Sequence, residues 1–323
     1  MEGVPQAYYQ TTHPLHDFSH ELEGVFRSLK RITLTADYRI YDFPLDAGVN
    51  QGNLGDPSTL ALAADSILDT RSKSGTAVVL ARTPQGVLLL TNFHVAHYPL
   101  LQLQYFDDGT GGAGIPRTQR PVASASIRFG QRGYLADHPN LGPFQIVASD
   151  SAVDLAILEV RLGQGLDFQS FAPIPVDIGN SRRLSWGSFV IVAGYPRGYP
   201  LATRGMVSDP NRDGAGGFLT DGLWNEGVSG GVILGVRGET GRMEWVGVAR
   251  AGAGAQEVRV LPRLDDTLHE PGLVFRYEGP LLVESLVRLQ YGITFSVPMA
   301  TVRDFVGRHR IALQSRGYDL RRY

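Results

Sequence analysis

The amino-acid sequence predicts an all-β protein with two β modules of similar size and helices only at its edges. The 323 residues include 39 glycines and 19 prolines, scattered among short runs of β-forming residues, which is typical of a barrel or sandwich core. A stretch at 170–184 that contains Pro173, Pro175, Gly179 and Asn180 divides these runs into two series. A chain of this length is long enough to bury a substantial core.

The expected strands are apolar, β-branched runs bounded by turn residues. In the first module they cover 76–81, 86–91, 126–129, 144–148 and 153–160. In the second module they cover 188–193, 201–207, 217–220, 231–236, 245–249 and 292–297.

Helices are expected near both ends of the chain. Amphipathic spacing predicts one over 17–29, and a second is expected over 58–69. A third begins after Pro298, which suits the first turn of a helix, and places Val302 and Phe305 on one face.

Composition excludes several classes of function. Hydrophobic residues make up 43% and charged residues 19% of the chain, and the net charge of -2 provides no basic surface for nucleic acid. The absence of cysteine excludes disulfides, thiolate metal sites and cysteine nucleophiles. No apolar run reaches the roughly 18 residues of a membrane span. The first residues lack a secretory signal, so we expect a cytoplasmic protein, although a chain beginning at a mature secreted or periplasmic terminus would look the same.

The functional prediction is based on three polar residues that lie next to strand-like runs in the sequence. Ser229 lies in the run Gly-Val-Ser-Gly-Gly at 227–231, His94 follows the run at 90–93, and Asp154 precedes the run at 155–158. A serine between glycines means little alone, because such turns are common in β proteins. The chain order His, Asp, Ser is one in which acyl-transfer triads occur.

The chemistry of acyl transfer requires these residue types. A serine hydroxyl is a weak nucleophile and needs a general base, a role that imidazole suits near neutral pH. A carboxylate orients that imidazole and stabilises the imidazolium formed during attack. Two N–H donors must then face the oxyanion, and those of Gly227 and Ser229 are the candidates.

Other interpretations of these residues were weighed against catalysis. His94 alone would more often be a packed, hydrogen-bonded histidine, and Asp150 competes with Asp154 as the orienting carboxylate. His97 forms a His-x-x-His pair with His94, but no nearby ligand completes a metal site and the spacing is not that of a zinc protease. We therefore expect no metal and no cofactor. Asp221 is expected to be a structural carboxylate at a strand end.

Seven segments in order make the chain resemble the trypsin-like serine peptidases of the chymotrypsin fold, and most closely the protease domain of HtrA/Deg proteins. They are 74–79, 90–96, 154–158, 192–198, 203–208, 220–231 and 293–298. The resemblance implies two packed six-stranded antiparallel β-barrels, with His94 as the base, Asp154 as its orienter and Ser229 as the nucleophile. Glu226, Val228 and Val232 depart from the residues usual in the family.

The same resemblance divides the chain into parts. An N-terminal extension with helices covers 1–70, the first barrel 71–170, the second barrel 171–300 with an insertion at 252–291, and a helix 301–323. No PDZ-like domain is expected after residue 300. We also expect a protein or peptide substrate, and a regulatory protein partner that displaces the N-terminal segment or the insertion.

The pocket for the residue before the scissile bond is expected to be apolar. Its predicted lining is Leu223, Trp224, Val248, Ala249 and Arg250. Leu223 stands where trypsin has an acidic residue that binds Arg or Lys, so an apolar preference is predicted. Arg250 would either narrow this pocket or pair with a substrate carboxylate.

The predicted function is therefore that of a serine endopeptidase working through an acyl-enzyme. One alternative is a protease-like scaffold that binds peptides without cutting them. Another is an α/β-hydrolase, because the serine segment also satisfies Gly-x-Ser-x-Gly; its acid would be Asp265 or Asp304 and its base His309. That fold needs long helices alternating with parallel strands.

Overall fold

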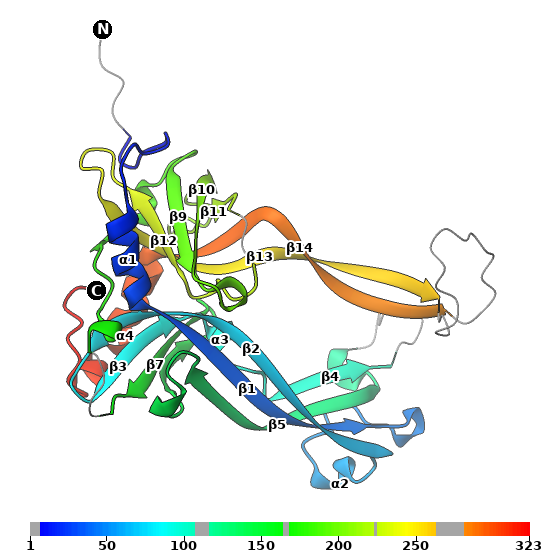
Figure 1. Ribbon diagram of the computed structural model, residues 1–323. Coiled ribbons are helices and arrows are strands. Elements are labelled where there is room, and N and C mark those ends of the chain that lie inside the picture. Colours follow the sequence, from blue (N-terminus) through cyan, green and yellow to red (C-terminus); the bar gives the residue numbers. More distant parts are fainter. Residues whose placement is uncertain (1–6, 107–115, 164–167, 223–224, 263–280) are drawn as a thin grey trace, which may run out of the picture.

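The computed structural model describes residues 7–106, 116–163, 168–222, 225–262 and 281–323. Two β-sheets form most of the protein, and its two longest helices belong to segments near the chain ends (Figure 1). The all-β class and the two-module organisation are confirmed. No helix in the described ranges is long and apolar enough to cross a membrane.

The first sheet has seven strands in the order β4-β5-β1-β2-β3-β7-β6. Their bounds are β1 Leu29–Asp42, β2 Asp65–Arg82, β3 Gly86–Thr91, β4 Leu101–Tyr105, β5 Val122–Leu135, β6 Gln145–Asp150 and β7 Leu155–Arg161. No pairing among the described residues joins β4 to β6, so this sheet is a half-barrel and not the closed six-stranded barrel that was expected. The long strands β1, β2 and β5 continue beyond the core as an arm, which carries β4 away from β6 (Figure 1).

The second sheet closes as predicted. Its strands are β8 Asp177–Ile178, β9 Phe189–Gly194, β10 Leu201–Asp209, β11 Leu219–Thr220, β12 Val232–Val236, β13 Met243–Pro262 and β14 Leu281–Pro298. The order β12-β9-β10-β11-β14-β13, together with pairing of β12 to β13, makes a six-stranded barrel. The short strand β8 adds to β13 in parallel.

Two of the predicted helices are present, and one is largely replaced by a strand. Helix α1 spans Ser19–Ser28, and α4 spans Met299–Gln314 directly after Pro298. The helix expected over 58–69 is only the single turn α2, Pro57–Leu60, because β2 begins at Asp65 and its residues Asp65 to Val78 pair with β1. Short 3₁₀ turns and the helical turn α3, Phe93–Ala96, complete the described elements.

The predicted extension 1–70 is not a separate part of the chain. Residues 29–42 form β1, which lies between β2 and β5 in the first sheet. The predicted insertion at 252–291 lengthens β13 and β14 into a projecting hairpin (Figure 1), and its residues 263–280 lie outside the described chain. Local propensity did not reveal β1, because its role depends on pairing with β2 and β5, which lie far from it in the sequence.

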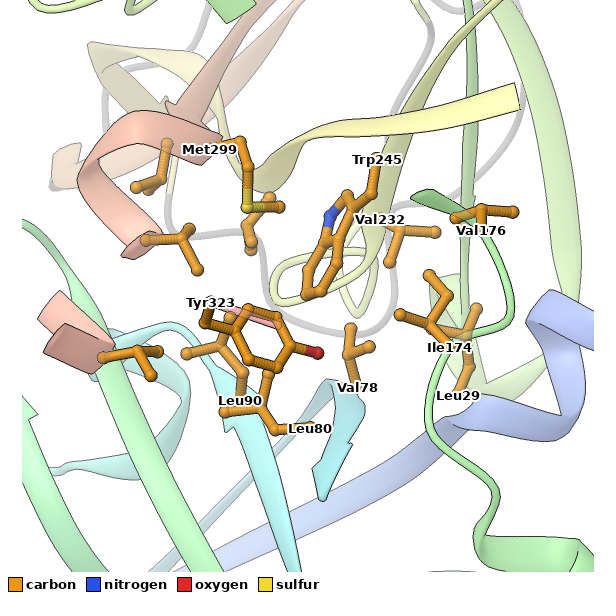
Figure 2. Packing of buried hydrophobic residues seen from close by; sticks show 14 of the residues in the cluster. Leu29, Val78, Leu80, Leu90, Ile174, Val176, Val232, Trp245, Met299 and Tyr323 are labelled. Atoms are coloured by element: carbon orange, nitrogen blue, oxygen red, sulfur yellow. The ribbon is translucent and has the colours of Figure 1, made fainter. Parts of the chain in front are cut away.

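The largest hydrophobic cluster lies between the two sheets. It joins Leu80 and Leu90 of the first sheet to Trp245 of the second, and Met299 of α4 and the last residue, Tyr323, close it (Figure 2). The rings of Trp245 and Tyr323 meet edge to face, with centroids 6.2 Å apart. Since each such buried side chain contributes about 1.5–3 kcal/mol, this cluster holds the two sheets in one relative position.

The N-terminal segment is built into the second barrel by Tyr9. This side chain is fully buried, its hydroxyl donates to Glu244 Oε2 at 2.8 Å, and it accepts from the N–H of Asn180 at 2.9 Å. Burial raises the pKa of Tyr9, so the hydroxyl stays protonated. The neighbouring N–H of Gln10 donates to the carbonyl of Val236 at 2.8 Å.

We predict that Tyr9→Phe lowers the free energy of unfolding by about 1–3 kcal/mol, because it leaves a buried carboxylate and a buried N–H short of a partner. Urea denaturation followed by tryptophan fluorescence measures this. Tyr199→Phe is the matched control, since Tyr199 is 73% exposed, and it should change stability by less than about 0.5 kcal/mol. Equal stability of the two variants would contradict the structural role of Tyr9.

Candidate active site

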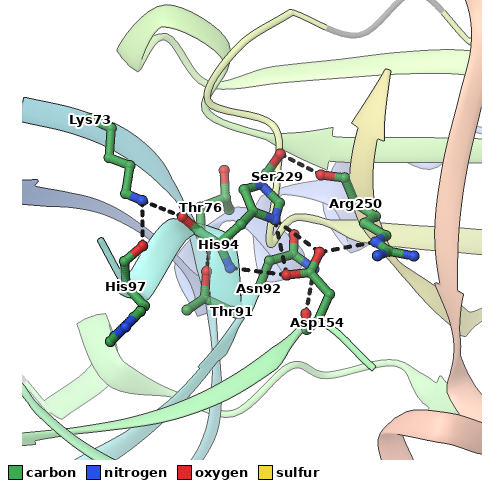
Figure 3. A network of polar contacts seen from close by, with 9 residues as sticks. All are labelled: Lys73, Thr76, Thr91, Asn92, His94, His97, Asp154, Ser229 and Arg250. Carbon is green, nitrogen blue, oxygen red and sulfur yellow. Dashed lines mark hydrogen bonds and ion pairs between the residues drawn. The ribbon is translucent and has the colours of Figure 1, made fainter. Parts of the chain in front are cut away.

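The predicted base and its carboxylate lie next to each other at the edge of the first sheet. His94 belongs to α3, just after β3, and Asp154 directly precedes β7. The Nδ1 atom of His94 lies 2.9 Å from Oδ2 and 3.0 Å from Oδ1 of Asp154, and the His94 backbone N–H donates to Oδ1 at 2.9 Å (Figure 3). Two contacts from one residue orient the imidazole. The His94 side chain is 45% exposed, so its ring reaches solvent.

Asp154 is held in an uncommon backbone conformation. Its φ is +56°, which few residues other than glycine adopt, although aspartate tolerates it better than most. The side-chain amide of Asn92 donates to the Asp154 carbonyl at 3.0 Å and supports this turn. Burial alone would raise the pKa of Asp154, but hydrogen bonds from His94 and the charge of Arg250 outweigh it and hold the pKa below its usual range. The carboxylate is therefore ionised near neutral pH.

Arg250 contacts the carboxylate of Asp154 and also the hydroxyl of Ser229. Its Nε donates to Asp154 Oδ2 at 3.1 Å, and its carbonyl accepts the Ser229 hydroxyl at 2.5 Å (Figure 3). Ser229 lies on the loop between β11 and β12, and in Figure 3 the dashed line from its hydroxyl leads to Arg250. The hydroxyl bond to Arg250 defines a resting orientation of the serine.

The loop around Ser229 depends on glycine at two positions. Gly227 and Gly230 have φ values of +99° and +88°. A Cβ on Gly230 would lie 1.9 Å from the Thr76 carbonyl oxygen, and one on Gly227 would lie 2.6 Å from the Tyr195 carbonyl oxygen. Both positions therefore exclude larger residues.

Two backbone donors of this loop remain available for an oxyanion. Within the described chain, the N–H groups of Gly227 and Ser229 have no hydrogen-bond acceptor, whereas the intervening Val228 N–H donates to Asn225 at 3.2 Å. The Ser229 carbonyl accepts from Thr76 N at 2.9 Å, which fixes the loop against the first sheet. These are the two donors predicted for the oxyanion hole.

A family model described as a trypsin-like peptidase domain matches residues 75–243, just over half of the chain. The chain belongs to the trypsin-like peptidase family. A search of curated proteins found no match.

Among solved structures, this trypsin-like peptidase is similar to the HtrA-type protease AlgW in complex with a decapeptide. That match has 18% identity and a TM-score of 0.46, and covers 92% of this chain and 67% of the other. It is also similar to the serine endoprotease from Yersinia pestis, with 15% identity, a TM-score of 0.42, and coverage of 92% and 67%. With AlgW bound to a tripeptide, the match covers 64% of the other chain.

The predicted substrate pocket of this trypsin-like peptidase is described only in part. Leu223 and Trp224 lie outside the described residues. Val248 and Ala249 are fully buried in hydrophobic clusters, and Arg250 extends to Asp154. The three described side chains thus do not line an open pocket together. The sequence had suggested that Arg250 either narrows the pocket or pairs with a substrate carboxylate. The structure shows a third arrangement, an ion pair with Asp154.

Asp221 and His97 have structural contacts. The Asp221 carboxylate accepts from the Met206 N–H at 2.6 Å, as expected for a carboxylate at a strand end. His97 stacks on Phe93, with ring centroids 4.8 Å apart. In the part of the chain that the structure describes, no three His, Asp or Glu side chains are grouped as metal ligands.

Thr76 on β2 is a site residue that sequence reasoning missed. Its Oγ1 donates to the Gly227 carbonyl at 2.8 Å and accepts from the Tyr195 N–H at 2.9 Å, and its own carbonyl accepts from Thr91 Oγ1 at 2.7 Å. A first-sheet residue thus holds the serine loop of the second. Thr76 lies in a matching family segment, but nothing local marks it as a clamp.

Lys73 is the second missed residue. Its ammonium donates to the carbonyls of His94 and His97, the latter at 2.7 Å, and lies 4.0 Å from the centre of the Tyr98 ring. Burial lowers the pKa of Lys73 to about 8. This contact anchors the short helix that carries His94.

We predict that Thr76→Val lowers the free energy of unfolding by about 1–3 kcal/mol, because it leaves the Gly227 carbonyl and the Tyr195 N–H unpaired in a buried place. If the loop N–H groups bind the oxyanion as predicted, the variant should also reduce kcat more than it raises KM, since these donors lose their position. Urea denaturation and peptide hydrolysis measure the two effects. Thr76→Ser keeps the hydroxyl and should retain most activity; equal losses in both variants would contradict the clamp.

Proposed function

We propose that this protein is a serine endopeptidase that cleaves peptide bonds through an acyl-enzyme. The observation that supports it most directly is the bidentate contact of His94 with Asp154 beside a glycine-bounded Ser229 loop with two free N–H groups. The base and carboxylate come from one sheet and the nucleophile from the other, which is the division that the family membership implies.

In the proposed mechanism, the Ser229 hydroxyl first turns from the Arg250 carbonyl toward Nε2 of His94. His94 takes the hydroxyl proton as Oγ attacks the scissile carbonyl, and Asp154 stabilises the imidazolium. The N–H groups of Gly227 and Ser229 receive the oxyanion. The imidazolium then protonates the leaving amine, and the same base activates water to hydrolyse the acyl-enzyme. The proposed base, its carboxylate, the nucleophile and the oxyanion donors all belong to this chain.

We also propose an apolar preference for the residue before the scissile bond. The position where trypsin carries an acidic residue is Leu223. The nearby carboxylate of Asp221 is engaged by the Met206 N–H at 2.6 Å, so it is not positioned as a partner for a basic substrate side chain. Val248 and Ala249, the residues of β13 that were predicted to line the pocket, have only apolar side chains.

A second candidate is a latent or inactive peptide-binding scaffold. The hydrogen bond from Ser229 Oγ to the Arg250 carbonyl at 2.5 Å favours it, because that bond must break before attack. The α/β-hydrolase alternative is wrong, because the described strands of both main sheets pair antiparallel except the short β8–β13 pair, and His309 lies on α4, against Phe305.

Reaction with a fluorophosphonate probe tests the proposed nucleophile. We predict labelling of the native chain and none of Ser229→Ala. Asp154→Asn should slow labelling by about 10⁴-fold, because the imidazole loses the partner that sets its tautomer. Circular dichroism of each variant controls for folding. A folded native chain that the probe never labels would support the scaffold instead.

Cleavage-site profiling with a peptide library tests the preference. We predict that Leu, Val or Phe before the scissile bond is cleaved at least about tenfold faster than Arg or Lys, because the apolar side chains assigned to this position give no partner to a charge. Leu223→Asp should shift the preference toward Arg and Lys. Preferential cleavage after Arg or Lys by the native chain would contradict the apolar assignment.

A further inference from the structure

A cavity of about 510 Å³ lies beside the Ser229 loop, on the side away from Arg250. Its walls come from both sheets: Arg31 and Lys73 from the first, and Arg197, Glu226 and Gly227 from the second. The size is within the roughly 300–1,000 Å³ of ligand pockets. Gly227 also carries one proposed oxyanion donor, so the cavity begins next to the reacting atoms.

Lys73 and Arg250 lie on opposite sides of the His94 and Ser229 pair (Figure 3). Under the proposed function, the residues before the scissile bond lie toward Arg250 and its strand. The residues after that bond then cross Gly227 toward Lys73. The cavity is therefore placed to receive the leaving half of a peptide substrate.

The charge of the cavity wall is positive, with three cations and one carboxylate. Arg31 is partly neutralised by Asp137, at 2.9 Å from its Nη2. Lys73 donates to the neutral carbonyls of His94 and His97, and the negative charge of Asp154 offsets part of its own charge. Glu226 is exposed and opposes the cations.

Backbone contacts hold this wall in place. The Arg197 N–H donates to the Glu226 carbonyl at 2.8 Å, and Arg31 Nη1 lies 3.4 Å from the Gly198 carbonyl oxygen. The Arg197 φ of +50° turns the chain sharply between β9 and β10. The cations are thus carried by ordered backbone next to the serine loop.

We propose that this cavity is a substrate subsite that binds acidic side chains at the first positions after the scissile bond. The proposal rests on the proposed function for its orientation. Arg31, Lys73 and Arg197 attract the substrate carboxylates, and Glu226 limits the affinity. The peptidase then selects substrates by an apolar residue on one side of the cut and acidic residues on the other.

Peptide binding to Ser229→Ala tests the subsite without requiring cleavage. Two fluorescent peptides share an apolar residue before the bond and carry Glu-Glu or Gln-Gln after it, with an amidated C-terminus to remove the terminal carboxylate. We expect the Glu peptide to bind about tenfold tighter at low salt, with a smaller ratio in 0.5 M NaCl because of screening.

Substitutions in the cavity wall show which side chains cause the preference for the Glu peptide. Arg197→Asn suits the positive φ and should reduce the Glu/Gln ratio by about three- to fivefold, whereas Glu226→Gln should raise it. Arg132→Gln is the matched control, because Arg132 is an exposed cation paired with Asp37 and is not part of the cavity wall; it should leave the ratio unchanged.

Equal binding of the two peptides, or a ratio insensitive to Arg197 and Glu226, would overturn the subsite. Fluorophosphonate labelling of the native chain keeps the two proposals apart. Labelling with equal peptide binding refutes only the subsite. Absent labelling with a persistent Glu preference supports the acidic-peptide site and refutes the peptidase.

Discussion

The packing of one sheet against the other is the constraint on which the site depends. His94 and Asp154 are carried by the half-barrel, and Ser229 and Arg250 by the closed barrel. The proposed base and the proposed nucleophile therefore come from different sheets. The cluster that joins Leu80 and Leu90 to Trp245, closed by α4 and Tyr323, determines how the two edges meet. A small shift between the sheets would separate the serine from its base.

Polar contacts between the two sheets then hold the Ser229 loop in place. Thr76 reaches from the first sheet to the Gly227 carbonyl, and its backbone N–H holds the Ser229 carbonyl. Gly227 and Gly230 provide the positive φ values that let the loop lie this close. The result is a loop held from across the interface, in which the N–H groups of Gly227 and Ser229 have no acceptor among the described residues.

The electrostatics of the site are asymmetric about the His94 ring. On one side, the Arg250 guanidinium shares the Asp154 carboxylate with the imidazole. On the other, Lys73 anchors the carbonyls of α3 and contributes to a cationic cavity. The same short helix is therefore flanked by two cations, one facing the carboxylate and one facing the proposed path of the leaving peptide.

Local sequence patterns were sufficient for the two-module β fold, for α1 and α4, and for the choice of His94, Asp154 and Ser229 as candidates. These features depend on periodicity, on proline and glycine, and on short segments that lie together in the chain. Tertiary structure alone decided that β1 belongs to the first sheet, that this sheet stays open, and that Arg250 lies on Asp154. It also decided the contact of Thr76 with Gly227, which are 151 positions apart. Such contacts depend on how two sheets pack, and that information is spread over the whole core.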